Sequence, residues 1–214
     1  MFQESVITIN LFNFDSPFYK ALSKLADMVI ISLLWLATCL PVITIGAATT
    51  AAYYVMTRRI SDMESNLLKD YFTEFKRSFK KSTVIFLIIA FFGLINIYNI
   101  FFVELPGMLR TATLVLQALL ALEFIFMFLH VFPLISRFDM SIKRLLMLSL
   151  MLANKHFLVT LALVGLLALI ILFCLLFPGL VFFAFGVYCW FSSRLLVWMY
   201  RKYLPNMDTN PDIK

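Results

Sequence analysis

Two ionisable residues inside an apolar stretch are the first candidates for chemistry. Glu123 and His130 stand seven positions apart, which is about two turns of a helix, so both side chains would lie on one face with Met127. Charged groups are costly in apolar segments and histidine titrates near neutral pH, so the two residues are candidates for a proton relay or a polar ligand site. The alternative is structural: Glu123 pairs with a Ser, Asn or Arg of a neighbouring helix, and His130 reaches the membrane interface.

Other chemistry has less basis in the sequence. Asn96 and Asn99 form a polar patch that would serve either helix packing or a ligand on the outer side. The three cysteines and two histidines are widely spaced, so they predict neither a disulfide framework nor a metal site. A phosphate-binding glycine loop, a nucleophile elbow and a helical His-Glu-x-x-His motif are all absent from the sequence. We expect no catalytic residues, no cofactor and no metal, and hence no enzyme.

The composition is that of an integral membrane protein. Of the 214 residues, 63% are hydrophobic and 14% are charged, and the mean hydropathy is +0.95. The apolar residues occur in continuous blocks of about 20, which is the length of a membrane-spanning helix, so we expect an all-α membrane protein. The net charge of +6 is explained by basic loops beside the membrane, and it gives no separate reason to expect nucleic-acid binding.

One membrane domain over residues 1–214 is expected, built as a compact bundle of about six helices. The two kinds of connection predict its orientation. Short turns with a Pro-Gly pair face outward, whereas basic segments face the cytoplasm, which leaves Arg110 as the single cation outside and places both termini in the cytoplasm. The predicted spans are residues 22–40, 46–60, 82–102, 111–135, 157–177 and 179–198.

The first two spans are predicted from one interrupted apolar run. Residues 22–57 would make a helix of about 54 Å, nearly twice the thickness of the hydrocarbon core, so we do not expect a single crossing. We expect a hairpin whose turn is bracketed by Pro41 and Gly46; the alternative is a re-entrant or broken helix, because the return arm is short. Asp27, near the inner boundary, is expected to pair with a nearby cation: Lys24, Arg58 or Arg59.

Two basic amphipathic segments, residues 66–81 and 139–155, are expected on the cytoplasmic side. In the first, aromatic residues recur at helical spacing on one face and basic residues fill the rest. Such a helix is typical of a membrane interface with anionic lipids, and the alternative is a docking surface for a protein partner. The basic and aromatic residues that make this segment amphipathic are Lys69, Lys76, Arg77, Lys80, Phe72, Phe75 and Phe79.

A family resemblance is carried by "DSPFYKALSKLADMVIISLLWLATCLPVITIGAATTAAYYV" and the following "LLKDYFTEFKRSFKKS". These stretches resemble the YesL-type family of small membrane proteins, which is common in Gram-positive bacteria and has no assigned activity. The most specific part is the Leu-Pro-x-x-Thr-x-Gly-Ala motif, formed here by Leu40, Pro41, Thr44, Gly46 and Ala47. The likeness covers residues 15 to about 81.

The resemblance implies a context rather than a reaction, because genes of this family often lie beside those of carbohydrate ABC importers. Our first hypothesis is an accessory or assembly protein that packs against a sugar ABC permease. The second is a small carrier or channel, alone or as a homo-oligomer, with Glu123 and His130 along a polar path. A third is a membrane sensor, which would use the same helices.

Overall fold

The computed structural model describes residues 17–60, 66–102 and 106–203, and over these ranges the chain forms helices and short connections without a strand. The predicted all-α fold is therefore confirmed. The helices in chain order are α1 (Pro17–Thr38), the 3-10 turn η1 (Val42–Thr44), α2 (Ile45–Ile60), α3 (Leu67–Phe102), α4 (Gly107–Arg137), α5 (Ile142–Lys155), α6 (Phe157–Leu176), the 3-10 turn η2 (Pro178–Leu180) and α7 (Val181–Tyr203).

Four helical segments of the described chain are long and apolar enough to cross a membrane. They are α3, α4, α6 and the run Pro178–Tyr200 that contains α7. Each contains, to within about two residues, one of the last four predicted spans. The two N-terminal helices do not belong to this set; α2 has 16 residues, about 24 Å in length, which is shorter than a hydrocarbon core of about 30 Å. A helical membrane protein is thus supported, and the count of six spans stays a prediction.

The segment 66–81 differs from the separate interfacial helix that the sequence predicts. It is the first half of α3, which runs without a break for 36 residues. Neither Pro nor Gly stands at the junction around Ser82, so nothing in the sequence ends the helix there. Tyr71 in this half is fully buried, and its hydroxyl lies 2.7 Å from the Thr38 hydroxyl and 3.4 Å from the Ala48 carbonyl oxygen. This part of the aromatic face therefore packs on the N-terminal hairpin rather than on lipid.

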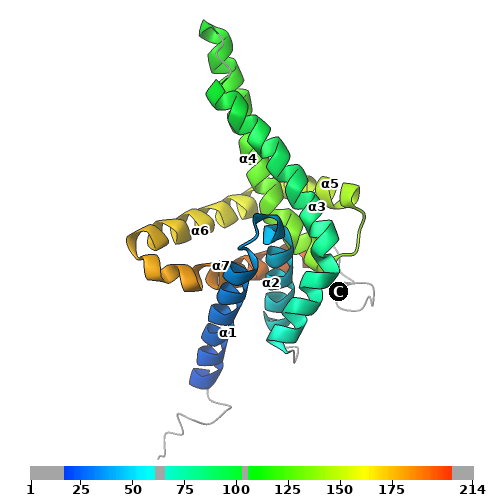
Figure 1. Cartoon of the computed structure of the whole chain (residues 1–214), viewed down its shortest axis with the longest axis vertical. Coiled ribbons are helices and arrows are strands. Elements are labelled where there is room, and N and C mark those ends of the chain that lie inside the picture. Colours follow the sequence, from blue (N-terminus) through cyan, green and yellow to red (C-terminus); the bar gives the residue numbers. More distant parts are fainter. Residues whose placement is uncertain (1–16, 61–65, 103–105, 204–214) are drawn as a thin grey trace, which may run out of the picture.

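The helices do not form the expected compact bundle. Figure 1 shows the α3–α4 hairpin projecting from the body in one direction and the α6–α7 hairpin projecting in another, with α1 leaving the body at a third point. The core lies where α2 contacts α3, α4 and α7. Four alanines of α2 have no exposed surface, namely Ala47, Ala48, Ala51 and Ala52. Their small side chains let the surrounding helices approach the α2 backbone closely.

Candidate functional site

The connection between α1 and α2 is held by side-chain hydroxyl groups. The Thr44 Oγ1 atom lies 2.5 Å from the carbonyl oxygens of Thr38 and Pro41, so it closes the turn from within. Pro41 has an extended backbone and precedes the 3-10 turn, in keeping with its inability to continue a helix. Leu40 is 83% exposed, so the apolar tip of the turn faces away from the protein.

Gly46 is the second residue of α2 and lies at a point where three helices meet. A Cβ atom on Gly46 would lie 2.6 Å from the Ser82 carbonyl oxygen of α3 and 2.9 Å from the Phe132 ring of α4. One turn later, Thr50 donates a hydrogen bond to the Gly46 carbonyl oxygen and lies 2.9 Å from the Ser82 hydroxyl. The Leu-Pro-x-x-Thr-x-Gly-Ala motif thus fixes a turn and a close helix crossing.

Glu123 and His130 both hold the joint between α5 and α6. The Asn154 side-chain amide donates to Glu123 Oε2 at 3.1 Å. His130 Nε2 lies 2.9 Å from the Thr160 hydroxyl, which in turn donates to the Ala153 carbonyl oxygen at 2.9 Å. With that donor role for Thr160, the assigned tautomer of His130 carries its proton on Nε2.

The environments of these two residues differ. His130 is fully buried, and its Nδ1 atom has no hydrogen-bond partner within the described chain. Glu123 is half-buried beside Asn154, at the surface of the same joint. Within the described ranges, no hydrogen bond or ion pair joins the two residues to each other. Their shared role in the structure is to attach α4 to consecutive parts of the α5–α6 joint.

Asn96 and Asn99 lie elsewhere on the α3–α4 hairpin. Asn96 is buried, and its Oδ1 atom finds no hydrogen-bond partner in the part of the chain that is described; Asn99 is half-buried. The chain reverses between Phe102, where α3 ends, and Gly107, where α4 begins. Counted from this turn, Asn96 lies opposite a part of α4 that is about ten residues, or about 15 Å, closer to the tip of the hairpin than Glu123 is. The four polar candidates therefore form two separate places rather than one site.

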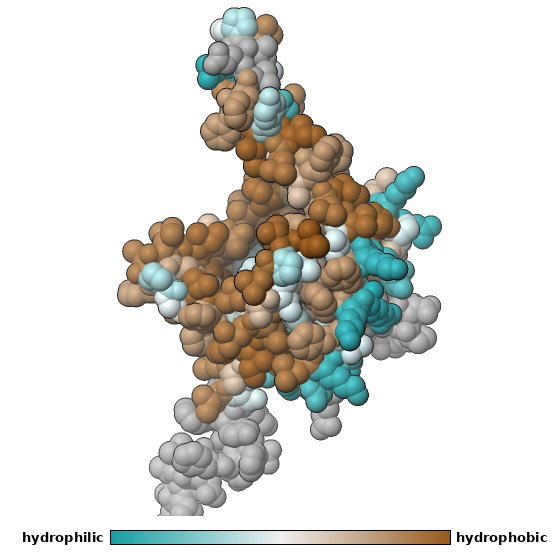
Figure 2. All heavy atoms as spheres, viewed as in Figure 1, coloured by the Kyte–Doolittle hydropathy of each residue, from teal (hydrophilic) through white to brown (hydrophobic). Residues whose placement is uncertain are grey.

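The basic side chains gather on one side of the molecule. Lys69, Lys76, Arg77 and Lys80 are exposed along the first half of α3, and Lys143 and Arg144 are exposed at the start of α5. Figure 2 shows hydrophilic residues over this side, whereas the two projecting hairpins are covered by hydrophobic residues. Of the aromatic residues, Phe72 is exposed, and Phe75 and Phe79 are half-buried. We call this surface, formed by the six basic residues and Phe72, the basic face.

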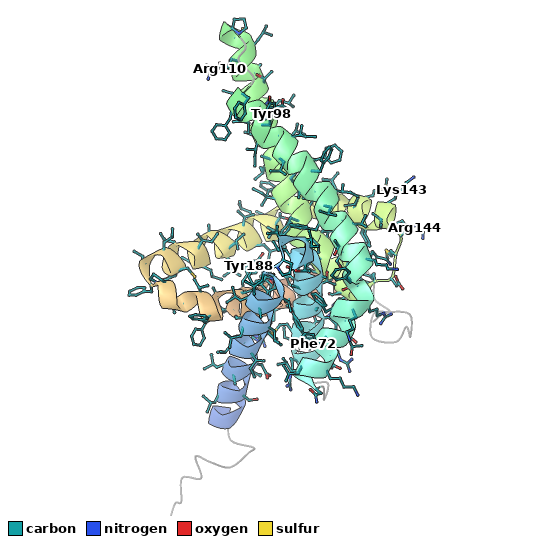
Figure 3. All side chains as sticks on the ribbon, in the orientation of Figure 1. Phe72, Tyr98, Arg110, Lys143, Arg144 and Tyr188 are labelled. Carbon is teal, nitrogen blue, oxygen red and sulfur yellow. The ribbon has the colours of Figure 1, made fainter. Side chains whose placement is uncertain are left out.

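An ion pair joins α3 to the connection that leads into α5. Lys81 Nζ contacts Asp139, and it donates to the Met140 carbonyl oxygen at 3.0 Å. Figure 3 places Lys143 and Arg144 on this side and Arg110 at the far tip of the α3–α4 hairpin. The charge asymmetry that the sequence predicts is thus also a separation in space.

Three further charged residues lie in partly or fully buried positions. Arg59 Nε lies 3.3 Å from Asp27 Oδ2, which confirms the expected pairing of Asp27 with a cation of the return helix. Glu74 of α3 is only 2% exposed, and the sequence reasoning did not single it out. The sequence does place Glu74 three residues after Tyr71 and four before Ser78, and this spacing puts the three residues on one face of a helix. In the structure Tyr71 and Ser78 are buried as well. No group of three His, Cys, Asp or Glu residues in the described ranges is placed to hold a metal ion.

Comparison with known proteins gives one match. A family described as "Protein of unknown function, DUF624" matches residues 28–100. No curated protein and no solved structure matches the chain. The matched region holds the turn motif, α2 and nearly all of α3, including the basic residues of α3, but neither Glu123 nor His130. What this chain shares with that family is therefore the N-terminal hairpin and the long helix packed on it.

Proposed function

We propose that this chain is a YesL-type protein of the bacterial cytoplasmic membrane that assists a carbohydrate ABC importer by packing against its permease. The family match covers most of the residues that carry the YesL resemblance, and that resemblance implies the neighbourhood of carbohydrate import genes. The role is non-catalytic, and it rests on helix contacts within the membrane together with the basic face in the cytoplasm.

The observation that carries this proposal is the projecting α3–α4 hairpin. Only 17% of the residues in the most apolar stretch of α3 are buried, because the hairpin extends well beyond the body of the protein (Figure 1). Its surface carries large apolar side chains that are exposed: Phe91, Phe92, Leu94, Tyr98, Phe101, Leu109 and Leu116. In a membrane such a surface offers van der Waals packing to another protein's helices.

The charges support one orientation of this hairpin. Basic segments are retained on the cytoplasmic side during membrane insertion. The basic face would then lie in the cytoplasm, and the tip with Arg110 would lie outside (Figure 3). Anionic headgroups of the inner leaflet would neutralise those lysines and arginines that a partner leaves uncovered.

The test is affinity purification of the tagged protein in mild detergent from its host, grown on an inducing polysaccharide. We expect stoichiometric recovery of permease subunits, identified by mass spectrometry. Leu94→Trp on the exposed hairpin should abolish that recovery, whereas Leu172→Trp, on an exposed position of α6, should retain it. Recovery of the protein alone as a homo-oligomer would contradict a stable permease complex.

A carrier is the second candidate, and the observation that favours it is the unpartnered, fully buried Nδ1 of His130. A buried histidine nitrogen without a partner is a site where a proton or a polar group can bind. Purified protein in proteoliposomes should then transport substrate or protons, and Glu123→Gln and His130→Gln should each reduce the rate. An absence of transport with both wild type and variants would exclude this function.

A further inference from the structure

A cavity lies between the α6–α7 hairpin and the core of the protein. Its volume is about 550 Å³, and it is lined by residues from α1, α2, α4, α6 and α7. Sites for small ligands measure about 300–1,000 Å³, so this cavity is large enough to hold one. It lies outside the region that the family match covers, apart from the residues contributed by α1 and α2.

The lining is almost entirely apolar. Leu167, Ile170 and Ile171 of α6 form one wall. The opposite wall is formed in part by the Trp35 and Phe185 rings, which are stacked with their centroids 4.0 Å apart. A surface of this kind binds hydrocarbon and offers nothing to a sugar or a nucleotide, which need several hydrogen-bonding groups.

Few polar groups reach the cavity, and two of them are already engaged. The Thr49 hydroxyl accepts a hydrogen bond from the Trp35 indole N–H at 3.1 Å, and the Tyr53 hydroxyl lies 2.9 Å from the Ser192 hydroxyl. Tyr188 is only 6% exposed, and its hydroxyl lies beside that of Tyr53 without forming a hydrogen bond of normal geometry in the described part of the chain. Figure 3 shows Tyr188 at the inner end of the α6–α7 hairpin, next to the body. An unsatisfied buried hydroxyl costs free energy, and a ligand oxygen would remove that cost.

The cavity is reached from the side of the hairpin turn. Leu175 and Val181, which flank the turn and belong to the lining, are exposed, whereas Tyr53 and Leu129 at the inner end are buried. Both helices of the hairpin are apolar enough to cross a membrane. In a membrane, lipid chains would lie against the exposed apolar side chains of these helices beside the opening, and such chains have the apolar character of the cavity walls.

We propose that this cavity binds the acyl chain of a membrane lipid, with the Tyr188 hydroxyl donating a hydrogen bond to an oxygen of that lipid. The chain belongs either to a phospholipid or to a free fatty acid, and both present a hydrocarbon body with an oxygen acceptor at one end. The site is independent of the proposed permease contact, which uses the α3–α4 hairpin.

The test uses the tryptophan already in the cavity wall. A protein with Trp35 as its only tryptophan (Trp190→Phe and Trp198→Phe) is placed in lipid nanodiscs, and its fluorescence is measured with phospholipid brominated at mid-chain, because bromine quenches only on contact. In a second arm, nanodiscs of unbrominated lipid are titrated with brominated stearic acid. A protein with Trp198 alone, which is 65% exposed, reports contact with bulk lipid.

We expect Trp35 to be quenched in one of the two arms, which identifies the source of the chain. Ala184→Phe, which fills the cavity from α7, should remove at least half of that quenching, while Leu172→Phe on the exposed side of α6 should leave it unchanged. Ile171→Phe is the second filling variant if the first does not fold. Tyr188→Phe should raise the half-saturating concentration of the quencher by about two- to tenfold.

Three results would overturn the proposal. The first is a Trp35 that stays unquenched in both arms while Trp198 is quenched. The second is quenching of Trp35 that neither filling variant reduces, because bulk lipid would then explain it. The third is an unchanged half-saturating concentration in Tyr188→Phe, which would remove the tyrosine from the site.

Discussion

Gly46 is the residue whose identity the packing most clearly requires. The nearest atom to a Cβ at this position is a backbone oxygen, that of Ser82 at 2.6 Å, and the Phe132 ring lies at 2.9 Å. A backbone atom in the middle of α3 cannot move without displacing the helix. The close crossing therefore depends on the absence of a side chain, and the turn motif is a packing motif at this residue.

Gly46→Ala should lower the free energy of unfolding by about 1–3 kcal/mol, because the added methyl group overpacks the crossing. Thermal unfolding of the purified protein in detergent measures this effect. Gly165→Ala in α6 is the matched control: nothing lies within 4 Å of its Cβ position, and alanine favours a helix over glycine by up to about 1 kcal/mol. Equal melting temperatures for the two variants would contradict the crossing.

For single residues, the sequence predicts which positions have a structural role better than it predicts the contacts that give them this role. The pairing of Asp27 with Arg59 follows from spacing and charge, and the structure confirms it. Gly46 is identifiable as a turn residue, but the atoms that exclude a side chain come from α3 and α4, which sequence spacing does not bring together. Glu74 is a charged residue on a helix with a mostly basic surface, so the pattern of charges predicts that it is exposed. Its burial results from the packing of neighbouring helices, which the pattern of charges does not show.

At the scale of elements, the continuity of α3 sets the shape of the protein. Its first half packs on α2, and its second half forms the projecting hairpin together with α4. One continuous helix therefore extends from the basic face to the hairpin tip. The sequence predicts the two halves correctly as an amphipathic and an apolar segment. It does not predict their fusion, because a change of composition at Ser82 looks like a boundary even though no helix-breaking residue stands there.

Thr83→Pro tests this continuity. Proline within a helix removes a backbone hydrogen bond and clashes with the preceding turn, at a cost of about 3 kcal/mol, whereas proline in the first turn is tolerated. We expect Thr83→Pro to lower the melting temperature strongly and Leu68→Pro, in the first turn of α3, to lower it little. Similar stabilities of the two variants would show that α3 is interrupted near residue 82.

The crossing of α1 and α7 is a second element-scale contact that a single residue permits. A Cβ on Gly186 would lie 2.0 Å from the Met28 carbonyl oxygen, and the Gly186 N–H donates to the Ser32 hydroxyl at 2.7 Å. Gly186→Ala should therefore separate the two helices and reduce stability by about 1–3 kcal/mol. Gly179→Ala at the open hairpin turn serves as the control. A disulfide between cysteines placed on α1 and α7 should form less readily in Gly186→Ala.

At the scale of the whole molecule, charge and hydropathy divide the surface in two. The basic face covers the first half of α3 and the start of α5, and the apolar hairpins lead away from it (Figure 2). Composition alone predicts a helical membrane protein with basic residues on one side. The directions of the two hairpins depend on close helix contacts, such as that of α2 with α3 at Gly46 and that of α7 with α1 at Gly186. Hydropathy alone does not predict such contacts.

This division predicts a membrane orientation that labelling of intact cells can measure. In a protein with its native cysteines replaced by alanine (Cys39, Cys174 and Cys189), single cysteines are introduced by Arg110→Cys, Gly179→Cys and Lys143→Cys. A membrane-impermeant maleimide should label the first two from outside, because they lie at the hairpin turns, and the third only after permeabilisation. Labelling of the Lys143→Cys protein in intact cells would reverse the orientation. Labelling of Arg110→Cys but not Gly179→Cys would mean that α6 and α7 do not cross the membrane as a hairpin.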